Sequence, residues 1–192
     1  MSAERKTEWT PDTYLAYERA AEERHEYHDG LVVLQAGGSR PHARIAINVS
    51  SALHAQLRSS TCNAFGSDMR IGLPRRRNYF YADVVVACDD TYEDEQIDTL
   101  TNPTVIIEVL SPSTEAYDRG RKFHLYATIP SLRDYLLVAQ DTLQVDHFRR
   151  HDGDLWLFAS YTARDDVVVL ASIDCTLPLS VVYEKITIDA SV

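Results

Sequence analysis

Two long apolar runs that each contain one acidic residue constrain this fold most. Residues 79–88 hold Asp83 next to three valines, and residues 104–110 hold Glu108 between an isoleucine and a valine. Runs so rich in Val and Ile are typical of strands buried on both faces of a sheet. A carboxylate in such a strand is costly unless it pairs with a cation or binds one. The sequence therefore predicts two central strands whose acids need partners.

The rest of the pattern predicts helices around this sheet. Helices are expected from Thr10 to about Glu23, from Pro41 to about Ser59, and from the segment 111–115 to about Thr128. Further strands are expected at residues 26–34 (a hairpin with Asp-Gly at its turn), 62–65, 69–73, 135–138, 143–148, 155–161 and 167–170. This order predicts an α/β (α+β) fold with a mixed sheet flanked by helices.

Length and composition favour one domain over residues 1–192, with 45% hydrophobic and 25% charged residues. The chain has no apolar run long enough for a transmembrane helix and no apolar N-terminal signal, so we expect a cytoplasmic protein that does not enter a membrane. Its three cysteines form no CxxC pair. They are expected to be reduced thiols, with Cys88 a small buried residue.

The net charge of −10 argues against a surface that coats nucleic acid. It does not exclude a nuclease, because bound cations reverse the field of a carboxylate site. The local basic cluster comprises Arg70, Arg75, Arg76 and Arg77. Taken alone, it is more simply explained as a solvated hairpin tip.

Asp83 and Glu108 could bind one hard cation if their strands are neighbours, since such ions take oxygen ligands. Pairing with arginines is the alternative for either acid alone, but the two together favour a metal site. Lys122 follows in the next helix, where it could reach back to hold a phosphate or an attacking water. By spacing alone, an ion pair with Asp118, four residues earlier, is the simpler explanation.

Two further residues are candidates for the same site. Glu26 precedes the Asp-Gly turn and is either a surface acid or a third carboxylate that supports the metal. His42, near the start of the second helix, faces a site or caps the helix. The chain lacks HExxH, GxSxG, GxGxxG and Walker motifs, so zincin, serine hydrolase, Rossmann and P-loop functions have no support.

These motifs, taken in order, resemble the Uma2 family, also classed as DUF820 and as restriction-endonuclease-like, within the PD-(D/E)XK nuclease superfamily. The resemblance covers about residues 14–183. It rests most specifically on the sequence Glu-Val-Leu-Ser-Pro-Ser-Thr from Glu108, followed by Asp118 and Lys122. It implies a restriction-endonuclease-like core with an N-terminal helix and hairpin.

The resemblance also implies roles for individual residues. Asp83 matches the acid of the PD element and Glu108 that of the (D/E)XK element, and these would hold Mg²⁺ or Mn²⁺. Glu26 matches the family's acid before the Asp-Gly turn, and Lys122 its displaced lysine. The chain departs from the family pattern at three positions: Ala82 replaces Pro, Leu110 replaces Lys, and Leu31 replaces an acid.

The implied function is metal-dependent hydrolysis of DNA, with the arginine cluster and His42 as candidate contacts to the nucleic acid. Two alternatives remain open: a catalytically silent module that binds nucleic acid or a protein, and a phosphodiesterase that acts on RNA or small nucleotides. A homodimer is expected, because two-fold symmetry matches duplex DNA.

Overall fold

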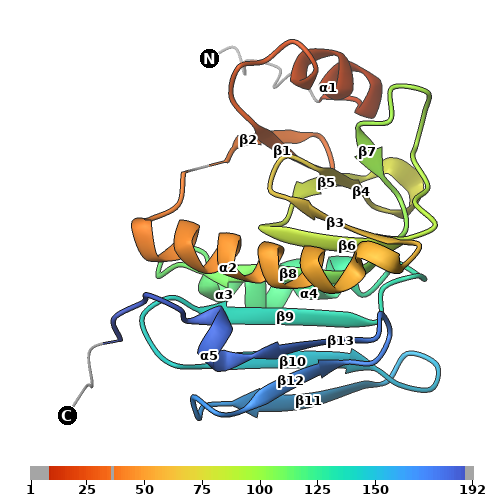
Figure 1. Ribbon diagram of the computed structural model, residues 1–192. Helices are drawn as coiled ribbons and strands as arrows, with labels where there is room; N and C mark the ends of the chain where they lie inside the picture. The colour runs from red at the N-terminus through yellow and green to blue at the C-terminus, as the bar shows by residue number, and fades with distance from the viewer. Residues whose placement is uncertain (1–8, 36, 189–192) are drawn as a thin grey trace.

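The computed structural model describes residues 9–35 and 37–188, and its strands form two main sheets (Figure 1). One sheet has six strands in the order β11-β10-β9-β8-β6-β3, and the other has five in the order β2-β1-β5-β4-β7. Strands β12 and β13 form a separate hairpin. Helices pack against these sheets, so the mixed α+β fold expected from the sequence is confirmed.

The six-stranded sheet contains the apolar run with Glu108, which forms β8, and the second half of the run with Asp83, which forms β6. Its strands are β3 (Cys62–Gly66), β6 (Val84–Cys88), β8 (Pro103–Leu110), β9 (Asp134–Ala139), β10 (Val145–Arg150) and β11 (Trp156–Tyr161). All neighbours are antiparallel except β8 and β9, which are parallel. A parallel pair needs a crossover connection, and a helical segment between β8 and β9 provides it.

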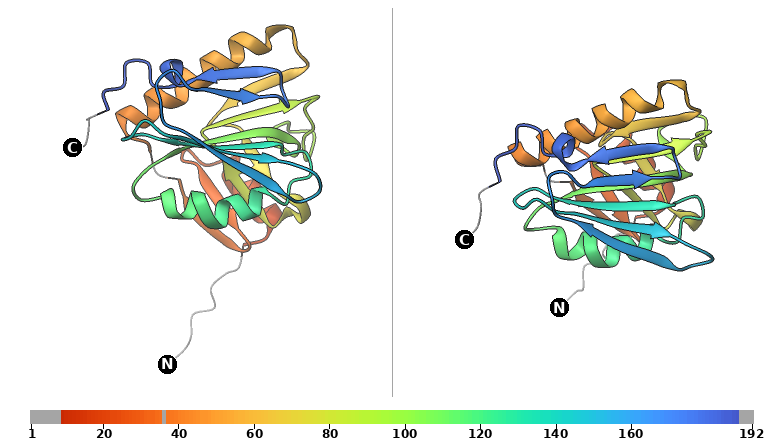
Figure 2. Two further views of the ribbon diagram at one scale, coloured as in Figure 1. Left: turned by 90° about the horizontal axis from the view of Figure 1, so that it is seen from below. Right: turned by 60° about the horizontal axis from the view of Figure 1, so that its bottom comes forward.

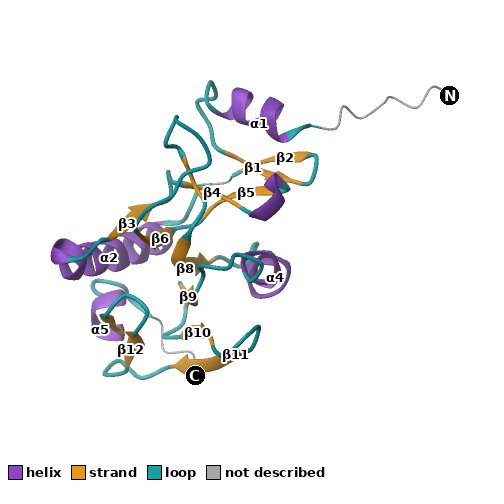
Figure 3. Cartoon of the chain, turned by 90° about the vertical axis from the view of Figure 1, so that its right-hand side faces the viewer, coloured by secondary structure: helices purple, strands orange, loops and turns teal. Residues whose placement is uncertain are grey.

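This crossover helix, residues 115–126, covers one face of the six-stranded sheet, and α2 (Arg40–Gln56) covers the other (Figure 3). The crossover helix comprises α3 (Glu115–Tyr117), a π-helical turn (Asp118–Lys122) and α4 (Phe123–Tyr126). On the face of α2, β12 (Val167–Leu170), β13 (Cys175–Pro178) and α5 (Leu179–Val182) complete the core (Figure 2). Within the described ranges, no helix is long and apolar enough to cross a membrane.

The five-stranded sheet carries the N-terminal hairpin. Its strands are β1 (His25–His28), β2 (Leu31–Leu34), β4 (Arg70–Gly72), β5 (Asn78–Tyr81) and β7 (Thr99–Leu100), and α1 (Pro11–Glu18) packs on it through Tyr14. Asp29 and Gly30 have φ values of 45° and 100°, the left-handed pair that a two-residue hairpin turn requires. The predicted Asp-Gly turn is therefore confirmed.

Several predicted boundaries differ from the structure. Helix α1 ends at Glu18 because its side chain accepts a hydrogen bond from the His25 backbone, which turns the chain into β1. The apolar run 79–88 is not one strand: it bends at Ala82 and Asp83, so β5 and β6 belong to different sheets. Strands β7 and β13 and helix α5 were not predicted; each spans only two to four residues.

The cysteine prediction was wrong for two of the three residues. Cys62 and Cys88 are paired in a disulfide, and Cys175 is a buried free thiol. Strands β3 and β6 pair in a register that places Cys62 directly opposite Cys88. The spacing of 26 residues gave no sign of this, because the pairing depends on strand register.

Candidate functional site

The bend between β5 and β6 places Asp83 beside Glu108. Val84 pairs with Ile107 in antiparallel register, so the residue before Val84 lies next to the residue after Ile107. One carboxylate oxygen of Asp83 accepts a hydrogen bond of 2.7 Å from the backbone N–H of Val109. The condition for a shared cation site, that the two acidic segments are neighbours, is therefore met.

Glu108 is buried, with 4% of its surface exposed, and its side chain points toward the crossover helix. Its Oε1 accepts a 3.0 Å hydrogen bond from the Tyr126 hydroxyl and lies 3.0 Å from Lys122 Nζ. Burial raises the pKa of Glu108 to about 8. The charge of Lys122 opposes this shift, and the charges of Asp83 and Asp118 add to it. A cation beside Asp83 and Glu108 would therefore stabilise the ionised carboxylate.

Lys122, on the π-helical turn, lies among three acidic side chains. Its Nζ is 3.0 Å from Glu108, 3.3 Å from Glu26 and 3.9 Å from Asp118. Burial alone would lower the pKa of Lys122, but these carboxylates together raise it, so the ammonium group stays charged. The ion pair with Asp118 is the longest of the three, so helix spacing alone does not explain the position of Lys122. Single π-turns within α-helices are often found at functional sites.

Glu26 reaches the site from β1. Its Oε1 contacts Lys122 and accepts a 3.4 Å hydrogen bond from the Tyr81 backbone, while its Oε2 lies 3.3 Å from His28 Nε2. The other ring nitrogen of His28 lies 3.2 Å from the Tyr117 hydroxyl. Although burial opposes the shift, Lys122 and His28 lower the pKa of Glu26. Glu26 is therefore an ionised partner of Lys122 rather than a surface acid.

His42 enters the site from the first turns of α2. Its Nε2 lies 2.8 Å from the second carboxylate oxygen of Asp83, and this hydrogen bond raises the pKa of His42 against the effect of burial. The ring packs on the backbone of Gly38, where an added Cβ would lie 2.6 Å from the imidazole. Its Nδ1 is buried without a hydrogen-bond partner among the described residues. His42 thus holds Asp83 in place and does not cap its helix with this side chain.

The site has an excess of negative charge. Three carboxylates, from Glu26, Glu108 and Asp118, surround Lys122, and Asp83 adds a fourth beside Glu108. In residues 9–35 and 37–188, no three His, Cys, Asp or Glu side chains form a complete metal-binding group. Mg²⁺ commonly uses one or two protein carboxylates and takes its other ligands from water and substrate phosphates. The donor set of Asp83 and Glu108 is of this kind.

The arginine cluster divides into buried, paired and exposed members. Arg70 is 3% exposed and binds Asp98, Thr99 and Tyr81 through its guanidinium group. The prediction that Arg70 contacts nucleic acid is therefore wrong, because α1 and the five-stranded sheet enclose its charge.

The other three arginines lie at the surface. Arg76 pairs with Asp12 and Glu93, and Arg77 lies 3.8 Å from Asp29. Arg75 has a left-handed backbone, with φ of 68°. A role for these three in nucleic-acid binding stays a prediction.

Three residues of the site were not among the sequence-based candidates: Tyr126, His28 and Tyr117. Tyr126 and Glu108 are hydrogen-bonded across the interface between the crossover helix and β8. His28 has a detectable signal, since it lies two residues after Glu26 and so shares its face of β1. Tyr117 has none, because its contact depends on how the helix packs against the hairpin.

Comparison with known proteins identifies the family of this chain. Residues 11–181 match the model of the Uma2 family, described as "Putative restriction endonuclease". An uncharacterized protein of Synechocystis sp. is 38% identical over 174 residues, which cover 91% of this chain and 90% of that protein. A second one from the same organism is 36% identical over 149 residues, covering 77% and 84%.

A solved structure shows the same fold. The crystal structure of a "putative nuclease belonging to DUF820" from Anabaena variabilis superposes with a TM-score of 0.74 at 17% identity, covering 91% of this chain and 97% of that one. The long family match and the two relatives above 30% identity agree with this likeness. The chain belongs to the Uma2 family.

Proposed function

We propose that this protein is a metal-dependent endonuclease that hydrolyses phosphodiester bonds in DNA. The observation that carries the proposal is the buried ammonium group of Lys122, which lies 3.0 Å from Glu108, on the strand paired with the one that follows Asp83. A fully buried lysine beside acids that need a cation fits a site for a phosphate and a metal ion. The family description points to the same class of reaction.

Asp83 and Glu108 are the residues that would hold Mg²⁺ or Mn²⁺. A divalent ion bound there supplies Lewis-acid chemistry, polarising the phosphate and lowering the pKa of a bound water. Lys122 places a fixed positive charge where the phosphate oxygens gain negative charge. Glu26 orients Lys122, and His42 orients Asp83, through the contacts described above.

Charge removal at the two acids tests the proposal. Asp83→Asn and Glu108→Gln keep the shape of the side chains but weaken the attraction for a cation, so both should lose Mn²⁺ binding in calorimetry and plasmid nicking. The exposed turn variant Asp152→Asn is the control and should keep both. EDTA should abolish nicking by the wild type, and excess Mg²⁺ should restore it. Nicking that persists in Asp83→Asn or in EDTA would contradict the proposal.

Two other functions would give different results. A catalytically silent binding module would leave plasmid and RNA intact at any metal concentration. A phosphodiesterase for RNA or small nucleotides would cleave a short dinucleotide but not duplex DNA. The net charge of −10 keeps this alternative open, because contacts to the DNA backbone need basic residues. On duplex DNA we expect a homodimer, which sedimentation of the bound protein would detect.

A further inference from the structure

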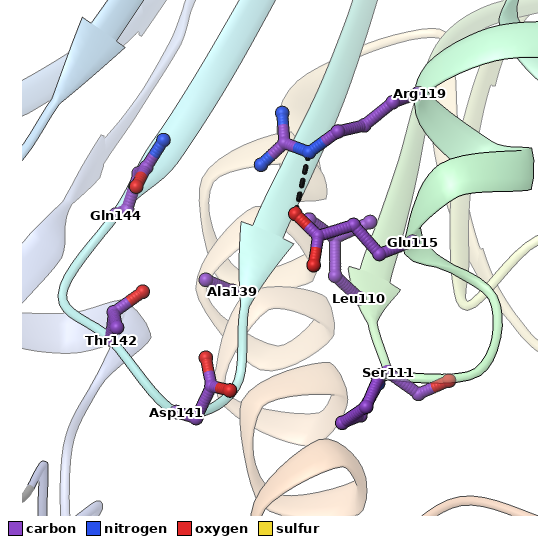
Figure 4. A pocket seen from close by; sticks show the side chains of 9 residues that line it. Leu110, Ser111, Glu115, Arg119, Ala139, Asp141, Thr142 and Gln144 are labelled. Carbon is purple, nitrogen blue, oxygen red and sulfur yellow. Dashed lines mark hydrogen bonds and ion pairs between the residues drawn. The ribbon is translucent and has the colours of Figure 1, made fainter.

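A pocket of about 240 Å³ lies at the carboxyl ends of β8 and β9 (Figure 4). We call it the strand-end pocket. Three segments line it: the end of β8 and the residues after it, the crossover helix, and the end of β9 with the β9–β10 connection. The lining residues are Leu110, Ser111, Pro112, Glu115, Arg119, Ala139, Asp141, Thr142 and Gln144. It is smaller than the pockets that hold drug-sized ligands, so it suits one ring system or a similarly small group.

The polar groups of the strand-end pocket disfavour an anion. Arg119 is its single basic residue, and its guanidinium group is already paired with Glu115 at 2.7 Å and with Asp146 at 2.5 Å. Asp141 adds another carboxylate to the lining. A phosphate would therefore meet a neutralised arginine and two acids, so phosphate binding here would be repulsive.

The same groups suit a neutral, flat molecule that forms hydrogen bonds. Leu110 and Ala139 contribute apolar surface at the strand ends, and Thr142, Gln144 and Arg119 add polar groups around the pocket (Figure 4). The Gln144 amide nitrogen donates to Asp146 at 3.0 Å, which fixes the side chain and leaves its oxygen as an acceptor. Arg119 Nη2 has no partner in the described part of the chain and remains a donor. Heteroaromatic bases combine apolar faces with such edge groups.

The strand-end pocket is next to the proposed active site. Leu110 lies two residues after Glu108 on the same face of β8, a spacing of roughly 7 Å. A hydrogen bond from Ser39 to Gln140 joins the start of α2, which carries His42, to the pocket's β9–β10 connection. A nucleotide adjoining a phosphate at Lys122 and Glu108 could therefore reach this pocket.

We propose that the strand-end pocket binds one unpaired nucleobase of the substrate, beside the phosphodiester bond that the enzyme cuts. This inference rests on the proposed nuclease function and narrows its substrate. A base paired in a duplex has no free edge for Thr142 and Gln144, so the substrate is single-stranded at this position or has a base turned out of the stack. Reading a base in this way also reduces the need for phosphate contacts, which matches the charge of −10.

Nucleoside binding tests this without requiring catalysis. The four neutral deoxyribonucleosides are titrated into the wild type and into Thr142→Trp, with binding followed by saturation-transfer NMR. The new indole fills the pocket from an exposed turn and should weaken binding roughly tenfold or more, equivalent to about 1.4 kcal/mol. Thr176→Trp is the matched control: it is exposed on β13, next to Gln56 at the other end of α2, and should bind as the wild type does.

A second variant guards against misfolding of Thr142→Trp. Asp141→Ala removes a lining group from an exposed turn, should keep the circular dichroism spectrum, and should change the preference among the four nucleosides. Absence of nucleoside binding to the wild type, or equal binding by wild type and both variants, overturns the inference. So does inorganic phosphate that displaces the nucleoside from the pocket.

Cleavage assays separate this inference from the proposed function. The wild type should cut an oligonucleotide with an unpaired nucleotide faster than the matching full duplex, and Thr142→Trp should lose that difference while Asp83→Asn loses all cleavage. Nucleoside binding without any cleavage would overturn the nuclease proposal alone. Equal cleavage of both substrates by wild type and Thr142→Trp would overturn the base pocket alone.

Discussion

At the scale of single residues, the site depends on charges that are buried with partners. Glu108 and Lys122 are 4% and 6% exposed, and each would be strongly unfavourable alone. Their ion pair, completed by Tyr126 and Glu26, lets both stay inside the fold. His42 likewise pairs with the carboxylate of Asp83, and the position of its ring depends on Gly38. Substitutions at Gly37 and Gly38, just before α2, therefore test how the position of His42 is fixed.

Gly38→Ala should displace His42 from Asp83, because the new Cβ would lie 2.6 Å from the imidazole Cδ2. Gly37→Ala is the matched control, since nothing lies within 4 Å of its Cβ position. Neither glycine has a positive φ, so backbone strain does not separate them. In ¹H–¹⁵N spectra, the His42 imidazole signals should move in Gly38→Ala alone. Equal spectra for both variants would show that the ring has room to adjust.

At the scale of elements, the edge strand β3 and the π-helical turn contribute most to the position of the site residues. The π-helical turn carries Asp118 and Lys122, and Lys122 contacts both Glu26 and Glu108. Strand β3 ends the six-stranded sheet and is linked to β6 by the Cys62–Cys88 disulfide. Strand β6 follows directly from Asp83, so this link stabilises the strand that presents an active-site acid.

Reduction of the disulfide should lower the free energy of unfolding by about 2–4 kcal/mol, because the link restricts the unfolded chain. Urea denaturation with and without a reductant measures the difference. The variant Cys62→Ser/Cys88→Ser should match the reduced wild type and be insensitive to the reductant, whereas Cys175→Ser should keep the full response. Thiol titration of the unfolded, unreduced protein should find one free thiol, from Cys175. Three free thiols would contradict the pairing.

At the scale of the whole molecule, ion pairs join segments that lie far apart in the sequence. Arg70 pairs with Asp98 between β4 and the segment before β7, and Arg119 pairs with Asp146 between the crossover helix and β10. Asp146 is 1% exposed and also accepts hydrogen bonds from Ser160 and Gln144. These interactions make global stability depend on ionised carboxylates.

Acidification should therefore remove the contribution of Asp146 to the free energy of unfolding. Burial opposes the shift, but the bonds from Ser160, Gln144 and Arg119 lower the pKa of Asp146 below its ordinary value. A lowered folded-state pKa stabilises above the unfolded pKa of about 3.9, and this stability is lost as the pH falls through the folded pKa. The difference in unfolding free energy between wild type and Asp146→Asn should be largest near neutral pH and shrink below about pH 4. The exposed control Asp152→Asn should show no such trend, and a pH-independent difference for Asp146→Asn would refute the assignment.

The sequence alone determined the elements whose signals are local. The two apolar runs predicted buried strands that each carry one acid, and the Asp-Gly pair predicted the hairpin turn. The burial of β6 and β8 and the φ values of the turn confirm these elements. The sequence also selected Glu26 and Lys122, which the structure brings within 3.3 Å of each other. Periodicity and turn chemistry depend on neighbouring residues, so they can be read without the fold.

Only the tertiary structure decided which distant groups meet. Arg70 was expected at the surface but lies buried against Asp98, and two cysteines expected as thiols are opposite each other on paired strands. The bend at Asp83, which turns one predicted strand into two, has no local signal in an apolar run. Each outcome depends on register and packing between segments far apart in the chain, where the gain from burial and pairing exceeds any local preference.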